Sequence, residues 1–280
     1  MLEKRTLATK PGFPTSLQDT KNYPKKYEAW FNDHFGMREK FVQLYNKLFI
    51  SIFHSSPTFN VIVGRDKWLF LASQFVAHDF MGLHLYPEER LAKWKTVLQE
   101  RQQWLENRGI HYLWLSPPNK IMVYPEYLPK RIRMRQGRTF LEQFQDYLSQ
   151  EPKFTNTLDL LTLLRQAKKS QRVYFKSDTH WNSDGAYAAY QAIIGYLSHI
   201  FPEFTPYPKE QLIRKPAVWS GDLTRFLNLM DMYKEKTSRL IHPEMQPPVH
   251  YPLIHVPPHP PSNLQRYRTG HFRIHERPDK

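Results

Sequence analysis

The 280-residue sequence predicts an α/β fold in which helices cover a mostly parallel sheet. Segments with helical periodicity alternate with single short apolar segments, which are typical of buried strands. Two of these apolar segments, 110–115 and 171–175, lead directly into polar loops. Sheets of this kind build their sites in loops beyond the carboxyl ends of strands. We therefore expect function at the loops around 116–120 and 178–180.

The N-terminal third predicts a lead-in, two helices and a hairpin. Residues 1–22 are polar and contain turn-forming residues, so they predict an extended lead-in. Apolar residues recur at helical spacing over 23–53, and Gly36 divides this segment into two expected helices. Two apolar runs in 60–71 flank the turn Gly64-Arg-Asp-Lys67, which predicts a two-stranded hairpin.

The rest of the chain predicts helices and strands in alternation. A helix opens at Pro87-Glu-Glu-Arg90, where a proline and acids favour a first turn, and ends before Gly109. The further expected elements are a strand at 110–115, helices at 140–148 and 158–168, a strand at 171–175, and a helix at 184–200. The segment 241–280 is rich in proline and histidine and predicts a weakly ordered tail. The expected folded domain therefore covers residues 23–240.

Composition limits the possible functions. Lys and Arg total 40 against 26 Asp and Glu, so the net charge is +14, which favours acidic partners or is simply a solvated basic surface. The chain has no cysteine, which excludes disulfides and cysteine-ligated metals. No apolar run reaches the roughly 20 residues of a spanning helix, and the N-terminus lacks a signal-peptide pattern. We expect no metal and no cofactor, and no nucleic-acid partner because no binding motif is present.

The segment Phe175-Lys-Ser-Asp-Thr-His-Trp-Asn-Ser-Asp-Gly185 carries the chemistry. It places Asp178 and His180 two residues apart in a polar loop. A Ser-His-Asp triad presents two of its partners in this way, with the aspartate orienting the imidazole and the histidine acting as general base. The structural alternative makes Asp178 a turn residue, Ser183 the N-cap of the next helix, and His180 a polar residue near the core.

No nucleophile accompanies this pair in the sequence. Ser238 lies in Lys-Thr-Ser-Arg and Ser262 in Pro-Ser-Asn, and neither follows an apolar strand or adjoins a glycine or aspartate. We assign neither serine as the nucleophile.

Four further residues are candidates for substrate binding. Asn119 suits an oxyanion or sugar hydroxyl and Lys120 an acidic sugar, although a proline turn explains both equally well. Tyr124 and Trp181 either pack in the core or contact sugar. The basic run 130–135 suits a polyanion or a solvated face.

Five blocks in order resemble a known family. They are 27–38, 63–70, 118–129, the Asp-Thr-His-Trp-Asn block 178–182, and the Ser-Gly-Asp-Leu block 220–223. With these blocks the chain resembles the SGNH-hydrolase-like polysaccharide O-acetyltransferases of bacterial exopolysaccharide assembly, the family of the alginate acetylation proteins AlgX and AlgJ.

The resemblance implies a flavodoxin-like, three-layer SGNH-type sandwich, permuted so that the Asp-His pair precedes the serine. It implies O-acetyl transfer to or from an exopolysaccharide, with Asp178 orienting and His180 as base. It also implies an acetyl donor, a membrane-bound acetyltransferase partner, and a place in the periplasm or cell envelope. The family's serine block follows the Gly-Asp-Leu block, and here the chain looks truncated before it. The alternative is a non-catalytic relative that binds polysaccharide or a partner.

Overall fold

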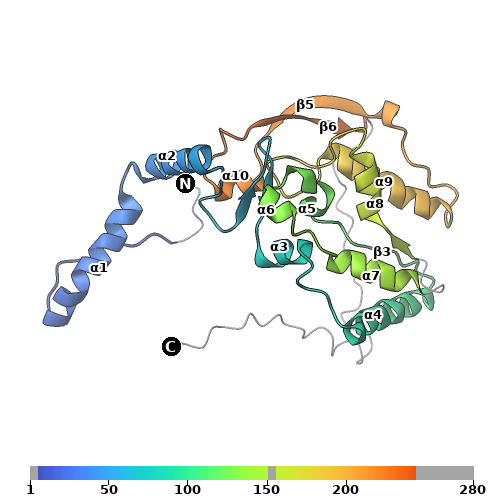
Figure 1. The fold of residues 1–280 in the computed structure, drawn as a ribbon, viewed down its shortest axis with the longest axis horizontal. Helices are drawn as coiled ribbons and strands as arrows, with labels where there is room; N and C mark the ends of the chain where they lie inside the picture. Colours follow the sequence, from blue (N-terminus) through green and yellow to red (C-terminus); the bar gives the residue numbers. More distant parts are fainter. Residues whose placement is uncertain (1–5, 151–155, 244–280) are drawn as a thin grey trace.

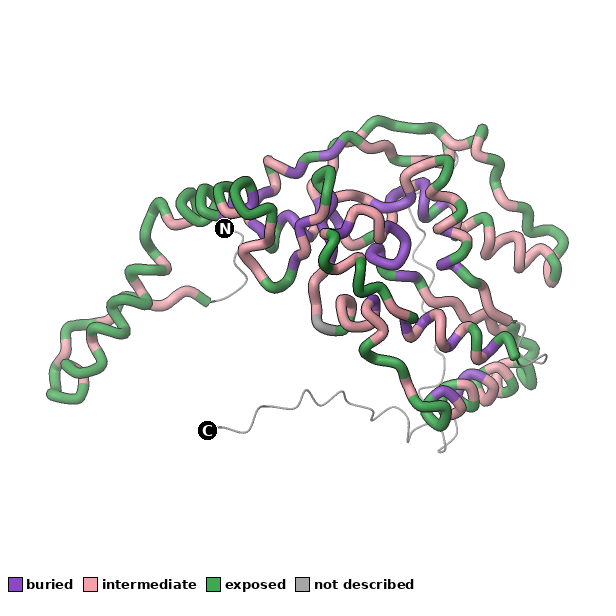
Figure 2. Tube along the Cα trace, viewed as in Figure 1, coloured by how far each residue is buried: buried purple, intermediate pink, exposed green. Residues whose placement is uncertain are grey.

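A computed structural model describes residues 6–150 and 156–243 (Figure 1). Two helices, α1 (Leu17–His34) and α2 (Arg38–Phe53), extend from the main body as an arm. The arm has little contact with the core, because α1 buries no residue and α2 buries only Asn46 and Ile50 (Figure 2). The break predicted at Gly36 is confirmed, since it lies in the turn between the two helices.

Helix α1 begins six residues earlier than the sequence predicts, inside the expected extended lead-in. Ser16 caps it, since the Ser16 hydroxyl oxygen accepts a hydrogen bond from the Asp19 amide at 3.0 Å. Asp19 also stands in the first turn, where the helix dipole favours a negative charge. Because Ser16 stabilises the first turn of the helix, residues 17–22 are helical despite the turn-forming residues just before them. The prediction of extended backbone over 17–22 is wrong.

The predicted hairpin is confirmed. Strands β1 (Val61–Val63) and β2 (Leu69–Leu71) pair antiparallel. Asp66 and Lys67 turn the chain with positive φ angles of 53° and 64°. The hairpin also supports the loop of interest, because the Leu69 amide donates to the Lys176 carbonyl at 2.9 Å.

The remaining helices follow the predicted order. The predicted helices correspond to α4, α7, α8 and α9, while α3, α5, α6 and α10 were not predicted. The bounds of all eight are α3 Gln74–Phe80, α4 Glu88–Glu106, α5 Lys120–Val123, α6 Lys130–Arg133, α7 Phe140–Ser149, α8 Leu160–Ala167, α9 Ser183–Ser198 and α10 Asp222–Phe226. Two 3-10 turns occupy Pro125–Tyr127 and Lys209–Gln211.

The predicted strands are shorter than expected. Strand β3 (Trp114–Leu115) occupies only the end of the segment 110–115. It pairs in parallel with β4 (Thr157–Leu158), of which Leu158 was predicted to be helical. The segment 171–175 contributes only one bridge, between Tyr174 and Trp181. Helix α8 begins at Leu160 because the Asp159 carboxylate caps it by accepting from the Thr162 amide.

A long hairpin closes the described chain. Strands β5 (Ile213–Trp219) and β6 (Glu235–Ile241) pair antiparallel, and α10 lies between them in sequence. Neither strand was predicted from the sequence. Their importance is positional, since each strand delivers one residue, Trp219 or Glu235, to the predicted loop.

The described residues thus form a mixed α/β fold with three two-stranded sheets, one of them parallel. The central core lies beneath the predicted loop, where Trp68, Phe70, Val123 and Leu164 are among the buried side chains. These sheets do not make one continuous parallel sheet within the described ranges. The predicted tail 241–280 lies outside the described residues from 244 onward. No helix of the described chain is both long and apolar enough to span a bilayer.

Candidate active site

The loop 175–180 is closed at its base by backbone pairing. The Asn182 amide donates to the Val173 carbonyl at 3.0 Å, and the Phe175 amide donates to the His180 carbonyl at 3.3 Å. Helix α9 follows at once, capped by Asn182, whose side-chain oxygen accepts from the Gly185 amide. The expectation that Ser183 is the cap is therefore wrong by one residue. Gly185 fits because a Cβ there would lie 2.1 Å from the Val173 carbonyl oxygen.

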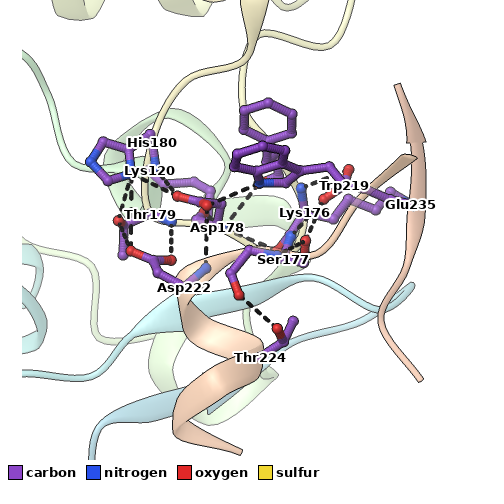
Figure 3. Close-up of polar contacts among 12 residues, drawn as sticks. Lys120, Lys176, Ser177, Asp178, Thr179, His180, Trp219, Asp222, Thr224 and Glu235 are labelled. Carbon is purple, nitrogen blue, oxygen red and sulfur yellow. Dashed lines mark hydrogen bonds and ion pairs between the residues drawn. The ribbon is translucent and has the colours of Figure 1, made fainter. Parts of the chain in front are cut away.

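The structure brings Asp178 and His180 together. His180 Nδ1 lies 2.7 Å from Asp178 Oδ1, and the His180 amide donates to the same oxygen at 3.0 Å (Figure 3). The aspartate side chain is 6% exposed, whereas the histidine side chain is 75% exposed. The carboxylate is thus a fixed, buried partner, and the imidazole faces solvent.

Two donors from outside the loop hold the other Asp178 oxygen. The Trp219 indole Nε1 donates to Asp178 Oδ2 at 3.0 Å, and the Asp222 amide donates to it at 3.2 Å (Figure 3). Burial by itself raises the pKa of Asp178, but the hydrogen bonds from His180, Trp219 and Asp222 outweigh it and hold the pKa below its usual value. The carboxylate is therefore ionised at neutral pH.

These contacts assign the tautomer of neutral His180. An ionised carboxylate only accepts hydrogen bonds, so Nδ1 carries the proton and donates it to Asp178. The Thr179 hydroxyl, 3.2 Å from Nδ1, donates its own proton to Asp222 at 2.5 Å and so agrees with this assignment. The lone pair is then on Nε2, which has no hydrogen-bond partner within the described part of the chain. Such a nitrogen is suited to accept a proton from a hydroxyl group.

A second carboxylate, Asp222 at the start of α10, holds the loop from the other side. It accepts from the Thr179 amide at 2.9 Å and from the Thr179 hydroxyl, and it lies 4.0 Å from His180 Nδ1. Asp178, His180 and Asp222 bring their ligand atoms within 4.8 Å of one another. The Nδ1 contact with Asp178 is a hydrogen bond in length, so the arrangement is suited to orienting an imidazole.

Glu235 on β6 anchors the beginning of the loop. Its carboxylate accepts from the Lys176 amide at 3.1 Å, from the Ser177 amide at 3.0 Å and from the Ser177 hydroxyl at 2.6 Å. Arg172 pairs with the same carboxylate at 3.1 Å. Trp219, Asp222 and Glu235 were not predicted as site residues. Only Asp222 had a signal, the Gly-Asp-Leu block that contains it.

Lys120 is a buried support of the loop, which corrects the expectation that it faces an acidic sugar. Its ammonium group donates to the carbonyls of Phe175 and Lys176 at 3.1 Å and of Asp178 at 2.5 Å. Burial lowers its pKa to about 7, against the attraction of Glu235, Asp178 and Asp222. Its side chain therefore fixes the path of the backbone that carries Asp178.

The other three candidates differ in exposure. Tyr124 is buried and its hydroxyl accepts from the Val173 amide at 2.9 Å; burial raises its pKa to about 12. Trp181 is half-buried against the central core. Tyr124 therefore packs beneath the loop, and the alternative that it contacts sugar is wrong. Asn119 is exposed, and its side chain makes no capping bond to α5.

Three serines of the described ranges have partners other than His180. The Ser177 hydroxyl bonds Glu235, and the Ser220 hydroxyl donates to the Met230 carbonyl at 2.8 Å. Ser238 lies in β6, where Arg214 donates to its hydroxyl. No serine of the described ranges is hydrogen-bonded to His180, and Ser262 lies outside those ranges.

A family model and several known proteins match this chain, and their names agree with one another. The family model "SGNH hydrolase-like domain, acetyltransferase AlgX" matches residues 61–250. The "Probable alginate O-acetylase AlgJ" of Pseudomonas syringae pv. tomato is 26% identical, over 79% of this chain and 55% of the relative. The AlgJ of Pseudomonas putida is 30% identical, over 62% of this chain and 43% of the relative.

One solved structure is the O-acetyltransferase domain of Pseudomonas putida AlgJ, with 24% identity, a TM-score of 0.41, and coverage of 65% of this chain and 66% of that one. This chain spans about half the length of the curated relatives that it matches. Since the family model covers more than half of the sequence, the chain belongs to the family of SGNH hydrolase-like domains represented by the acetyltransferase AlgX.

Proposed function

We propose that the chain contributes the Asp178–His180 pair to a site that transfers O-acetyl groups to, or removes them from, an exopolysaccharide. The observation that carries the proposal is the 2.7 Å contact between a buried carboxylate and an exposed imidazole whose Nε2 faces solvent. The names of the relatives, alginate O-acetylases, support an acidic polysaccharide as the substrate.

His180 acts as the base in this proposal. A hydroxyl oxygen attacks the acetyl carbonyl carbon while its proton passes to Nε2, and the C–O bond to the leaving group then breaks as Nε2 returns the proton to that group. Asp178 keeps the imidazole in the required tautomer and stabilises the imidazolium that forms. In the triad form the attacking hydroxyl belongs first to a serine, and then to the sugar that takes the acetyl group from it.

The wider setting is also part of the proposal. The chain from α2 to β6 forms the SGNH-type unit, a permuted three-layer sandwich. The activity takes place in the periplasm or cell envelope, with an acetyl donor and a membrane-bound acetyltransferase as partners. Family membership supports these statements.

Release of acetate from p-nitrophenyl acetate tests the proposal. We expect His180→Ala to lower the rate constant on the order of 1,000-fold or more, because general-base catalysis contributes roughly 100- to 10,000-fold. His199→Ala is the matched control, since His199 is an exposed histidine at the far end of α9 and should leave the rate unchanged. Equal rates for wild type and His180→Ala would contradict the enzymatic function.

One observation favours a second function. No serine among the described residues is hydrogen-bonded to His180, which fits a non-catalytic relative that binds polysaccharide or a partner through the same loop. The same experiment separates the two. A chain with no His180-dependent acetate release that still binds polysaccharide would support the binding function.

A further inference from the structure

A hollow separate from the Asp178–His180 loop opens beside Asn119. Its volume is about 350 Å³, within the range of roughly 300–1,000 Å³ that is usual for ligand pockets. Helix α3, the start of α4 and the start of α7 surround it. Helices α3 and α7 are fastened together there, because the Phe140 amide donates to Asp79 Oδ1 at 2.7 Å.

The walls of the hollow are aromatic and held in place. Phe75, Tyr86 and Phe140 line it, and the last two rings meet edge to face with centroids 4.7 Å apart. Tyr86 is clamped through its backbone, since its amide donates to the Gln143 side chain at 3.0 Å and its carbonyl accepts from that side chain at 2.9 Å. Phe75 is 62% exposed. The exposed ring of Phe75 is flat and apolar, and can pack against the C–H face of a pyranose.

The polar groups of the hollow match a sugar that carries a carboxylate. The Arg90 guanidinium lies 3.9 Å above the Tyr86 ring, and among the described residues no carboxylate pairs with it. This stacking leaves the planar fork of Arg90 free to bind a carboxylate with two hydrogen bonds. His84 also borders the hollow.

Asp79 is the acidic group of the hollow. It already accepts a hydrogen bond from the Phe140 amide, and burial raises its pKa. Its remaining oxygen is an acceptor for a sugar hydroxyl. Arg90 can thus pair with the carboxylate of an acidic sugar while Asp79 accepts from one of its hydroxyls.

The backbone joins this hollow to the Asp178–His180 loop. Asn119 borders the hollow, and both of its neighbours in sequence bond to the loop segment. The Pro118 carbonyl accepts from the Tyr174 hydroxyl at 2.5 Å, and the Lys120 ammonium donates to the Asp178 carbonyl at 2.5 Å. Asn119 therefore lies in sequence between two buried residues that support the loop.

We propose that this hollow is a subsite for a uronate residue of an acidic polysaccharide, with Phe75 as the stacking surface, Arg90 binding the carboxylate, and Asn119 and Asp79 binding hydroxyls. Its place beside an acetyl-transfer site rests on the proposed function. The binding chemistry rests on the hollow alone.

Isothermal titration calorimetry of the full chain with a mannuronate hexasaccharide tests the proposal, with cellohexaose as the neutral probe. We expect Arg90→Gln to weaken binding of the hexauronate by about 10-fold or more and to leave cellohexaose unaffected, since only the carboxylate pair is lost. Phe75→Ala should weaken both ligands by about 10-fold, because the stacking surface serves any pyranose.

Matched controls come from a different surface. Phe59 and Arg131 line another hollow, which shares no residue with the one beside Asn119. Phe59→Ala removes a phenylalanine that is 100% exposed, and Arg131→Gln removes the positive charge of an arginine. Both should bind as wild type does. Wild type that fails to bind the hexauronate would overturn the proposal. The same holds if all four variants bind equally, because binding would then come from the general basic surface.

His180→Ala distinguishes this proposal from the proposed function. It should bind the hexauronate with the wild-type Kd, since His180 does not line the hollow. Loss of binding in Phe75→Ala and Arg90→Gln, together with unchanged acetate release in His180→Ala, would support the subsite and contradict the proposed function. His180-dependent acetate release without an effect of Phe75 or Arg90 on binding would do the reverse.

Discussion

At Asp178, burial and hydrogen bonding act in opposite directions on one carboxylate. Burial disfavours its charge, but the four donor contacts from His180, Trp219 and Asp222 stabilise it. A folded-state pKa below the usual value means that Asp178 stabilises the fold above the pKa of an unfolded aspartate, about 3.9. That contribution is lost as the pH falls through the lower, folded-state pKa.

Asp178→Asn should therefore lower stability most at neutral pH. The side-chain amide of asparagine has one NH2 group in place of a carboxylate oxygen, and this group faces N–H groups that donate to the carboxylate in wild type. At least one of these buried N–H groups then has no acceptor. The difference in unfolding free energy from wild type, measured by urea titration, should be a few kcal/mol near pH 7 and shrink below about pH 4. Acetate release should fall on the order of 1,000-fold or more, because the imidazole loses its tautomer. Asp231→Asn, with a side chain that is 90% exposed, is the control. A pH-independent difference would count against an ionised, stabilising Asp178.

Lys120 gives the opposite sign of pH dependence. Its folded-state pKa of about 7 lies below the ordinary lysine pKa of 10.5, so between these limits the unfolded chain holds a proton that the folded chain releases. Stability then rises with pH across that window, by up to about 1.4 kcal/mol per pH unit.

Lys120→Met should remove this slope. The facing charges are Glu235, Asp178 and Asp222, which favour the ammonium form, and Arg172, which opposes it. Urea titrations from pH 7 to 10 should show wild type gaining stability relative to the variant. Parallel stability curves for the two proteins would show that Lys120 keeps its proton in the fold.

At the scale of elements, the site depends on packing α10 against the loop. Gly221 makes this approach possible, since a Cβ there would lie 2.3 Å from the Ser177 carbonyl oxygen and 2.5 Å from Asp178 Cβ. The Gly221 amide also donates to the Ser177 hydroxyl at 3.1 Å. The first turn of α10 thus touches the backbone of the loop, and no side chain fits between them.

Gly221→Ala should force α10 away from the loop. We expect a loss of about 1–3 kcal/mol, as for overpacking of a filled core, and a drop in acetate release as the Asp222 and Trp219 contacts with Asp178 lengthen. Gly195→Ala is the matched control, because Gly195 lies inside α9 with nothing within 4 Å of a Cβ. That change should raise stability by about 0.5–1 kcal/mol. If both variants melt at the same temperature, the close approach at Gly221 has no energetic consequence.

The sequence predicted helices better than strands, for a physical reason. Helices such as α4 and α9 carry an apolar stripe over several turns, so their periodicity is visible locally. Strands β5 and β6 are long, but β5 is mostly exposed and contains Pro216, which removes the usual signs of a buried strand. The helices and the hairpin that were predicted from local pattern were confirmed. The predicted mostly parallel sheet was not, because the described residues form three two-stranded sheets.

The candidate site divides in the same way. Asp178 and His180 were identified because they lie two residues apart in one loop, so their proximity follows from the sequence. Trp219 and Glu235 lie 41 and 58 residues from their hydrogen-bond partners, and the β5–β6 hairpin that positions them was not predicted. The charge of Lys120 led to the prediction that it binds an acidic sugar. Its burial depends on the packing of α5 under the loop, which cannot be inferred from the local sequence.

For the whole molecule, the arm is the part least connected to the core. Helix α1 buries no side chain, whereas α2 places Ile50 in a buried cluster and bonds the Leu227 carbonyl through Asn46 at 2.7 Å. Deletion of residues 1–36 should therefore change the melting temperature little. Deletion of residues 1–53 should lower it, because Leu223, Leu227 and Leu69 then lose Ile50 as a partner. Equal melting temperatures for the two deletions would show that α2 does not stabilise the core.

The role of His180 as base is tested most directly by nitrogen NMR of its imidazole near pH 8. We predict a protonated Nδ1 and an unprotonated Nε2, because the Asp178 carboxylate accepts the Nδ1 proton. In Asp178→Asn the preference should weaken or invert. A wild-type His180 with the proton on Nε2 would leave no lone pair facing solvent, and would contradict general-base catalysis by this pair.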